Sequence, residues 1–470
     1  MAKTKIIGTI GPASNDLDTL RAMIVNGMDV VRLNMSHSDY AFCDDVIAKV
    51  QQLNEELDRN VAIMLDTNGP TVRLHTFQNG EVELKKDMTV YIHMEEIIGT
   101  EKEFSVDYPG LIHDVRHHDM IKLDDGRIEL KVIDKDPSLL ICKVITGGII
   151  QDRKSLNVPQ VRLKIPFLNT SDKAAILYAA HHDVDFLALS FVQSSEDVLE
   201  VNDLLIQENN DHLGIISKIE NENAVDDIDA LIKVSDGIMI ARGDLGVELP
   251  FERVPGIQKM IINKCHHAGI VSIVATEMLS SMEQASRPTR AEVSDVANAV
   301  LDGVDAVMLS GETTIGNYPV ETVMMMERII ASSEEDINYY ALLETSMRTE
   351  KQDITGNIAY SVVDCANRLK CVAIVAPTVS GYTARKISRF RPSCPILAIS
   401  PDLETVKSLA LNFGVKAIYR KKLESIEAMS KIAKTSIENY LDYDQGKYIL
   451  TGGYPFKESR HTNFMKIEEL

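Results

Sequence analysis

Short runs of apolar residues recur along the chain, and a segment with helical periodicity follows many of them. The apolar runs are predicted to be β-strands at residues 5–10, 30–35, 61–67, 185–191, 214–220, 237–243, 272–278 and 306–312. The clearest amphipathic segments are predicted to be helices at residues 16–27, 172–182, 222–234 and 290–303. Uninterrupted apolar strands that alternate with helices indicate a parallel sheet covered by helices.

Eight such strands are the number that a closed (β/α)₈ barrel, the TIM barrel, requires. A doubly wound open sheet shows the same alternation of strands and helices, so it is the alternative fold. We expect an α/β protein whose main domain is the barrel.

The alternation of strands and helices is interrupted once, after the third strand. Between residues 70 and 165 apolar and polar residues alternate one by one, as in the half-buried strands of an antiparallel sheet. The pair Asp125-Gly126 lies between two such runs and is typical of a hairpin turn. We therefore expect a small antiparallel β domain inserted into a barrel loop, on the face where catalytic loops lie.

Beyond residue 345 the rhythm of strands and helices resumes as a separate unit. Its strands are predicted at residues 371–377, 395–400, 415–419 and 447–453. The predicted division of the chain is a barrel in two parts, 1–69 and 166–345, an inserted B domain, 70–165, and a C-terminal α/β domain, 346–470.

The composition narrows the classes of function. The chain of 470 residues is 45% hydrophobic and 25% charged, which is typical of soluble globular domains. Its net charge of −21 argues against non-specific binding to nucleic acid or to an anionic membrane. The six cysteines form no regular framework, which favours free thiols in a reducing compartment. Since no signal peptide or run of about 18 apolar residues is found, we expect a cytoplasmic protein.

Most polar residues that interrupt the predicted barrel strands fall at the carboxyl ends of those strands, where a barrel gathers its catalytic groups. These residues are Arg32, Asn34, Asp66, Lys218, Glu220, Arg242, Asp244, Thr276, Ser310 and Glu312. One charged strand end is usually a solvated edge. Because several strands contribute polar groups, we expect the side chains to converge on one site.

Lys218 and Glu220 lie two positions apart on one strand, so both side chains leave the same face of the sheet. Glu220 and Asp244 come from neighbouring strands and suit Mg²⁺ or Mn²⁺, which leaves coordination positions for substrate oxygens. The alternative is a structural ion pair between Lys218 and Glu220. Residues 241–246 are expected to turn into a short helix that offers N–H groups to an anion. Lys218 and Arg32 can neutralise charge on a transferring phosphoryl group.

Seven segments closely resemble motifs of the pyruvate kinase family, and the resemblance covers essentially the whole chain. The segments are RLNMSH (32–37), LDTNGP (65–70), ISKIEN (216–221), GIMIARGDLGVELP (237–250), ATEML (275–279), RPTRAEVSDVAN (287–298) and DAVMLSGE (305–312). The resemblance implies transfer of a phosphoryl group from phosphoenolpyruvate to ADP, giving pyruvate and ATP in the last step of glycolysis. It also implies a homotetramer and an inserted domain that closes over the site and excludes water.

The resemblance implies a role for each matching residue at the reaction centre. Lys218 matches the lysine that stabilises the phosphoryl transition state. Glu220 and Asp244 match the ligands of the divalent metal, and Thr276 lies on the face where the enolate is protonated. The residues that match substrate contacts are Arg32, Gly243, Asp244 and Thr276.

The resemblance also implies a monovalent-cation site for K⁺ and contacts to the nucleotide, ADP or ATP. The K⁺ site would consist of Asn34, Ser36, Asp66 and Thr67. The nucleotide contacts would be His37, Arg73 and Lys154, although the segment around Lys154, DRKSLNVP, departs from the family's usual glycine-rich form.

Three residues in the matching motifs differ from the family's usual pattern. Asn68 and Thr71 stand in DTNGPTVR where the family usually has DTKGPEIR, and Glu277 stands where ATQML has glutamine. Thr71 supplies no charge, so it cannot replace K⁺ as the lysine of potassium-independent members does. We expect Asp66 to leave an anionic pocket that needs a cation, and the enzyme to require K⁺.

Residues 377–385 resemble the phosphate-binding loop of the family's sugar-phosphate effector site. Backbone N–H groups and hydroxyls at a turn between strand and helix suit a phosphate. Residues 451–464 lack the glycine-rich form of the family's effector lid, which leaves a sugar phosphate or a nucleotide as the possible effector. The predicted effector contacts are Thr378, Ser380, Gly381 and Thr383.

Two other functions compete with this assignment. Another barrel enzyme that handles phosphoenolpyruvate or pyruvate would not account for the inserted β domain or for RLNMSH. A non-catalytic metabolite sensor would have no need of the intact set Lys218, Glu220 and Asp244. We therefore expect a metal-dependent phosphotransferase.

Overall fold

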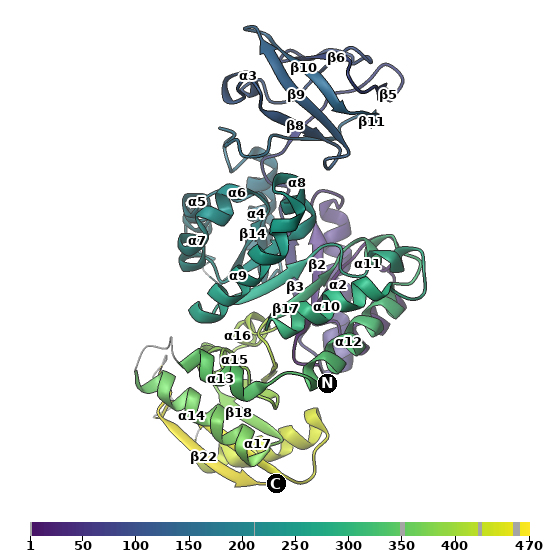
Figure 1. Ribbon diagram of the computed structural model, residues 1–470. Coiled ribbons are helices and arrows are strands. Elements are labelled where there is room, and N and C mark those ends of the chain that lie inside the picture. The colour runs from purple at the N-terminus through teal and green to yellow at the C-terminus, as the bar shows by residue number, and fades with distance from the viewer. Residues whose placement is uncertain (1, 211, 348–352, 422–424, 455–460) are drawn as a thin grey trace.

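A computed structural model describes residues 2–210, 212–347, 353–421, 425–454 and 461–470. Three units lie one after another in space, with a barrel between a β-rich domain and a C-terminal α/β domain (Figure 1). The chain begins in the barrel, leaves it to form the β-rich domain, returns to complete the barrel, and ends in the C-terminal domain.

Eight parallel strands close into a barrel in the order β1-β17-β16-β15-β14-β13-β3-β2. The first strand pairs with both β17 and β2, which confirms the predicted barrel and excludes the open sheet. Each strand overlaps one of the eight predicted runs. The strands are β1 (Lys5–Thr9), β2 (Val30–Asn34), β3 (Ala62–Asp66), β13 (Phe186–Leu189), β14 (Gly214–Ile219), β15 (Gly237–Ala241), β16 (Val271–Ala275) and β17 (Ala306–Leu309).

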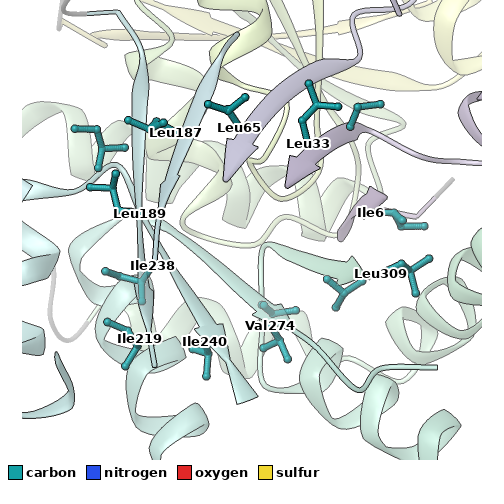
Figure 2. Close-up of a cluster of buried hydrophobic side chains, with 14 of the residues drawn as sticks. Ile6, Leu33, Leu65, Leu187, Leu189, Ile219, Ile238, Ile240, Val274 and Leu309 are labelled. Atoms are coloured by element: carbon teal, nitrogen blue, oxygen red, sulfur yellow. The ribbon is translucent and has the colours of Figure 1, made fainter. Parts of the chain in front are cut away.

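Alternation along these strands separates two apolar cores. Leu33, Leu187 and Ile240 belong to the cluster between the strands and the surrounding helices, part of which Figure 2 shows. Met64 and Ile216 belong to a second cluster, which fills the barrel. Since successive side chains point to opposite faces, every second residue near the carboxyl end of a strand also enters the barrel interior.

The barrel helices follow the predicted segments, with one difference. The segment 222–234 forms two helices because Asp227 leaves the helical geometry and its carboxylate accepts a hydrogen bond from Ser195 N. The short helix predicted after residue 241 is present as α8. The helices are α1 (Leu17–Val25), α2 (Tyr40–Leu57), α4 (Thr170–His181), α5 (Ser195–Gln207), α6 (Glu222–Asp226), α7 (Ile228–Val234), α8 (Arg242–Glu248), α9 (Val254–Ala268), α10 (Arg290–Leu301), α11 (Gly311–Thr314) and α12 (Pro319–Glu335).

The inserted domain contains a seven-stranded sheet in the order β4-β12-β8-β9-β10-β6-β7 and a two-stranded sheet of β5 and β11. It is antiparallel as predicted except for β6 and β7, which are parallel because the connection 94–102 carries the chain back along β6. The predicted hairpin joins β8 and β9. The elements are β4 (Val72–Arg73), β5 (Glu81–Leu84), β6 (Thr89–His93), β7 (Glu103–Ser105), α3 (Leu111–Asp114), β8 (Met120–Leu123), β9 (Ile128–Lys135), β10 (Leu139–Thr146), β11 (Gly148–Gln151) and β12 (Ser155–Asn157).

The C-terminal sheet has the order β20-β19-β18-β21-β22. Its first four strands along the chain are parallel and confirm the prediction, whereas β22 is an antiparallel edge strand that was not predicted. The elements are α13 (Tyr339–Met347), α14 (Ile354–Leu369), β18 (Ala373–Pro377), α15 (Tyr382–Ser388), β19 (Ile396–Ser400), α16 (Leu403–Ser408), β20 (Val415–Tyr419), α17 (Ile426–Leu441), β21 (Lys447–Gly452) and β22 (Phe464–Glu469).

All six cysteines carry free thiols, and all but Cys365 are buried, as expected from their irregular spacing. No helix within the described ranges is both long enough and apolar enough to cross a membrane.

Candidate active site

A polar layer lies above the apolar filling of the barrel. Met64 and Ile216 belong to that filling, and two positions further along the same strand faces come Asp66 and Lys218. Ser190 continues the interior face of β13 in the same way. The period of the strands therefore brings these three side chains together, and the hydrogen bonds among them confirm that they meet.

Asp66 is the centre of this layer and is completely buried. Its carboxylate accepts hydrogen bonds from Arg32 Nε at 2.6 Å, Lys218 Nζ at 3.1 Å and Ser190 Oγ at 3.0 Å. Burial would raise the pKa of Asp66, but Arg32 and Lys218 outweigh burial and hold this pKa below its usual value. Asp66 is therefore an anion that fixes the two basic side chains.

Lys218 is held from three sides. Besides its bond to Asp66, Nζ donates to Ser190 Oγ at 2.6 Å and pairs with Glu220 Oε1 at 3.0 Å. Burial would lower the pKa of Lys218, but Asp66 and Glu220 raise it above its usual value, so the side chain is an ammonium. The ion pair between Lys218 and Glu220, which was the alternative to a metal site, is thus present, and it occupies one oxygen of Glu220.

Glu220 and Asp244 are the two remaining carboxylates of the cluster. The second oxygen of Glu220 accepts a hydrogen bond from Phe191 N at 2.6 Å. Burial raises the pKa of Glu220 to about 7. Burial also raises the pKa of Asp244, and Asp125 at the tip of the β8–β9 hairpin adds to that rise.

The donor set of this cluster fits a hard divalent cation that shares its coordination with a substrate. Three carboxylates, Asp66, Glu220 and Asp244, face two basic groups, Arg32 and Lys218, so the cluster has surplus negative charge. Among the described residues no three or more His, Cys, Asp or Glu side chains are arranged to hold a metal by themselves. Mg²⁺ usually takes only one or two protein carboxylates and retains water or substrate oxygens.

Thr276 follows β16 in a backbone conformation that is rare for a β-branched residue. Thr276 and Glu277 have φ values of 66° and 55°. Thr276 Oγ1 accepts a hydrogen bond from Gly243 N at 2.8 Å, and Arg242 Nη2 donates to the carbonyl oxygens of Thr276 and Glu277 at 2.7 and 3.1 Å. These bonds place Thr276 beside the first turn of α8, which also carries Asp244.

The four residues predicted for K⁺ lie at the neighbouring ends of β2 and β3, where Asn34 pairs in register with Asp66. Asn34 Oδ1 accepts a bond from Ser36 N at 3.1 Å, and Ser36 Oγ donates to Asn68 Oδ1 at 2.8 Å. Thr67 is buried. The prediction of an anionic pocket at Asp66 was wrong, because Arg32 and Lys218 already neutralise this carboxylate.

The residues predicted to contact the nucleotide lie on two domains. Arg73 is on β4, and Lys154 immediately precedes β12, the strand that pairs with β4. Lys154 Nζ forms an ion pair with Asp124 Oδ1 at 2.8 Å. His37 is exposed on the barrel, in the loop after β2. The structure therefore joins Arg73 and Lys154 on the inserted domain and leaves His37 on the barrel.

A cleft separates the inserted domain from the barrel. Thr71, Asp125 and Asn157 line it on the side of the inserted domain, and Asp244 and Glu248 line it on the barrel side. The metal-fitting carboxylate Asp244 therefore faces the gap between the two domains.

The predicted effector residues all lie between β18 and the first turns of α15: Thr378, Ser380, Gly381 and Thr383. Gly381 has a φ of 75°, which favours glycine. Thr378 and Thr383 are buried, and Thr383 Oγ1 shares a hydrogen bond with Thr462 Oγ1 at 2.9 Å. Of the segment 451–464, residues 455–460 lie outside the described residues.

Two residues make contacts in the candidate site that sequence reasoning missed. Ser190 bridges Lys218 and Asp66, and its position on the interior face of β13 was the available signal. Arg242 was placed at the rim without a role, yet it fastens the Thr276 loop to α8. Glu312, also expected at the rim, instead accepts a backbone hydrogen bond from Leu279 at 3.0 Å.

Known proteins resemble this chain in architecture and in sequence. Two family models match the chain, "Pyruvate kinase, barrel domain" over residues 1–323 and "Pyruvate kinase, alpha/beta domain" over residues 356–468. A pyruvate kinase of Bacillus licheniformis is 43% identical over 99% of this chain and 80% of its own length. One from Clostridium perfringens is 42% identical over the full length of both chains.

The fold agrees with that of a solved relative. A crystal structure of a pyruvate kinase from Cryptosporidium parvum superposes with a TM-score of 0.94 at 34% identity, covering 99% of this chain and 96% of that one. The two family models together span most of the chain, and the relative that matches over its full length is 42% identical. The chain belongs to the pyruvate kinase family.

Proposed function

We propose that the polar layer at the carboxyl ends of the barrel strands is the centre for phosphoryl transfer from phosphoenolpyruvate to ADP. The observation that carries the proposal is the position of Lys218, whose ammonium is buried among Asp66, Ser190 and Glu220. A fixed positive charge needs no reorganisation when charge moves, so it stabilises a transferring phosphoryl group more than a mobile group would. Arg32, fixed by the same aspartate, is the second such charge.

Glu220 and Asp244 would hold Mg²⁺ or Mn²⁺, and the pair fits because both are hard oxygen donors in a cluster with surplus negative charge. When bound, the divalent ion supplies charge stabilisation for the oxygens of the substrate. Gly243 and Asp244 on α8, together with Arg32, would orient the substrate. Thr276 would present its hydroxyl to the carbon that is protonated to give pyruvate.

Arg73 and Lys154 would contact ADP from the inserted domain, and His37 would contact it from the barrel. Closure of the inserted domain over the cleft would bring the two sets together and exclude water, which competes with ADP as the acceptor. The position of Asp244 in that cleft supports this arrangement.

K⁺ would bind to the oxygen atoms of Asn34, Ser36, Asp66 and Thr67. Asp66 is neutralised within the protein, so an anionic pocket does not support this site. The support is the grouping of these residues at the ends of β2 and β3 and the oxygen atoms that they offer. Thr71, which lines the cleft, carries no charge, so it cannot replace the cation as a lysine at that position would.

We divide the chain into a barrel, 1–69 and 166–345, a B domain, 70–165, and a C-terminal domain, 346–470. We also propose a cytoplasmic homotetramer without nucleic-acid or membrane partners. A sugar phosphate or nucleotide would bind as an allosteric effector at residues 378–383.

A coupled assay for pyruvate tests the proposed reaction directly. The purified protein should form pyruvate from phosphoenolpyruvate only when ADP, a divalent cation and K⁺ are all present. Pyruvate formation at the same rate without ADP would indicate hydrolysis and overturn the proposed acceptor. A lack of pyruvate under every condition would favour a non-catalytic sensor.

A further inference from the structure

The inserted domain is joined to the barrel by side-chain hydrogen bonds at the end of α8. Lys122 Nζ, on β8, donates to Val247 O at 2.6 Å. Asn157 Nδ2, on β12, donates to Glu248 Oε1 at 2.9 Å. The two donors therefore come from neighbouring strands of the inserted domain, and both acceptors belong to the last two residues of one barrel helix.

The end of α8 is suited to receive these donors. The last carbonyl groups of a helix have no partner within the helix, and a cationic side chain there is favourable. Leu249 N bonds to Leu245 O, so the cap does not use Val247 O. Burial raises the pKa of Glu248, while the bond from Asn157 and the charge of Lys122 act against that rise.

The opposite end of α8 carries groups of the proposed reaction centre. Gly243 N bonds to Thr276 Oγ1, and Asp244 belongs to the pair that fits the divalent cation. The helix is only seven residues long, so a shift at one end moves the other. A movement of the inserted domain would therefore act on Asp244 through one short helix.

We propose that Lys122 and Asn157 are positioning residues that latch the inserted domain onto α8, so that its closing over the cleft sets the geometry of Asp244. This inference rests on the proposed role of the cleft in catalysis. It assigns the latch to two side chains outside the set proposed to bind the substrate and the metal. Loss of the latch weakens closure and, through α8, the response to the divalent cation.

The test uses a tryptophan reporter in the full-length protein, which contains no tryptophan of its own. Arg127, at the exposed tip of the β8–β9 hairpin, is replaced in the variant R127W. Its emission is titrated with phosphoenolpyruvate in the presence of MgCl₂ and without ADP. Because no turnover occurs, the reading is independent of whether Lys218 and Thr276 have their proposed chemical roles.

Lys122→Met with Asn157→Ala should raise the phosphoenolpyruvate concentration at half-maximal signal by about tenfold, because a hydrogen bond to a charged group is worth about that factor or more. The Mg²⁺ concentration at half-maximal signal should rise in parallel. Lys122→Arg, with Asn157 unchanged, keeps a cationic donor, so both half-maximal concentrations should stay near those of the parent. Lys86→Met, on an exposed turn of the same domain, is the matched control and should behave like the parent.

A titration curve of the double variant that superimposes on that of the parent would overturn the latch. A parent reporter whose emission does not respond to phosphoenolpyruvate and MgCl₂ would overturn the closure on which the latch depends. A double variant with shifted phosphoenolpyruvate binding but unchanged Mg²⁺ dependence would also contradict the link through α8.

Discussion

Replacement of Ser190 by alanine tests how the polar layer positions Lys218. Ser190 Oγ accepts from Lys218 Nζ at 2.6 Å, and its single proton is shared between two acceptors, Asp66 Oδ1 at 3.0 Å and Thr67 O at 2.7 Å. In Ser190→Ala the ammonium keeps its two carboxylate partners, so it stays charged and buried. It loses the contact that holds it between them, and Asp66 loses a neutral donor.

The size of the expected fall in kcat follows from the kind of hydrogen bond that is lost. A hydrogen bond to a charged group contributes about 1.5–3 kcal/mol. If that contribution is needed in the transition state, kcat falls by about 10- to 100-fold, since each 1.36 kcal/mol is a factor of about ten. The KM for phosphoenolpyruvate should change little, because Lys218 keeps its charge and Arg32 keeps its bond to Asp66.

The assay is steady-state pyruvate formation at saturating Mg²⁺ and ADP, together with urea unfolding. Ser235→Ala is the matched control, because Ser235 Oγ is buried and bonds to Ser217 Oγ at 2.7 Å outside the polar layer. The control should lose stability without a comparable loss of kcat. An unchanged kcat in Ser190→Ala, with stability reduced as in the control, would refute the positioning of Lys218 by this hydroxyl.

Three further predictions concern single groups of the site. Lys218→Met should lower kcat by about 100-fold or more while phosphoenolpyruvate still binds, and a residual kcat above about a tenth would exclude the proposed role. Because burial raises the pKa of Glu220 to about 7, its carboxyl is largely protonated below that pH. Calorimetry should therefore show proton release on Mg²⁺ binding at pH 6 and little at pH 9, and equal release at both pH values would contradict the metal assignment. Turnover in K⁺ should exceed turnover in tetramethylammonium at matched ionic strength, and Thr71→Lys should narrow the gap; equal wild-type rates would exclude a K⁺ requirement.

The barrel could be predicted because the period of its strands is visible in the sequence. The run 237–241 is apolar on both faces, and only a sheet covered by helices buries both. The same period predicted that Lys218 and Glu220 share a face, and the ion pair of 3.0 Å between them confirms it. The position of Asp66 beside Arg32 could not be predicted, since it depends on the register between β2 and β3.

The elements that escaped prediction depend on contacts distant in the sequence. The edge strand β22 contains Glu468 and Glu469, and it forms because β21 offers a free edge rather than because of its own apolar pattern. The parallel pairing of β6 with β7 follows from the path of the connection 94–102, which carries no periodic signal. Neutralisation of Asp66 was missed for the same reason, because its partners lie on other strands.

In the proposed mechanism Glu220 and Asp244 form the divalent-cation site of a phosphotransferase. Titration of Mn²⁺, followed by the electron spin resonance of the free ion with phosphoenolpyruvate present, tests it most directly. Asp244→Asn keeps the side-chain shape but removes one charge, so its Mn²⁺ affinity should fall by about tenfold or more. Glu252→Gln, an exposed acid just beyond α8, should bind Mn²⁺ as the wild type does. Equal Mn²⁺ affinities of Asp244→Asn and the wild type would contradict the account.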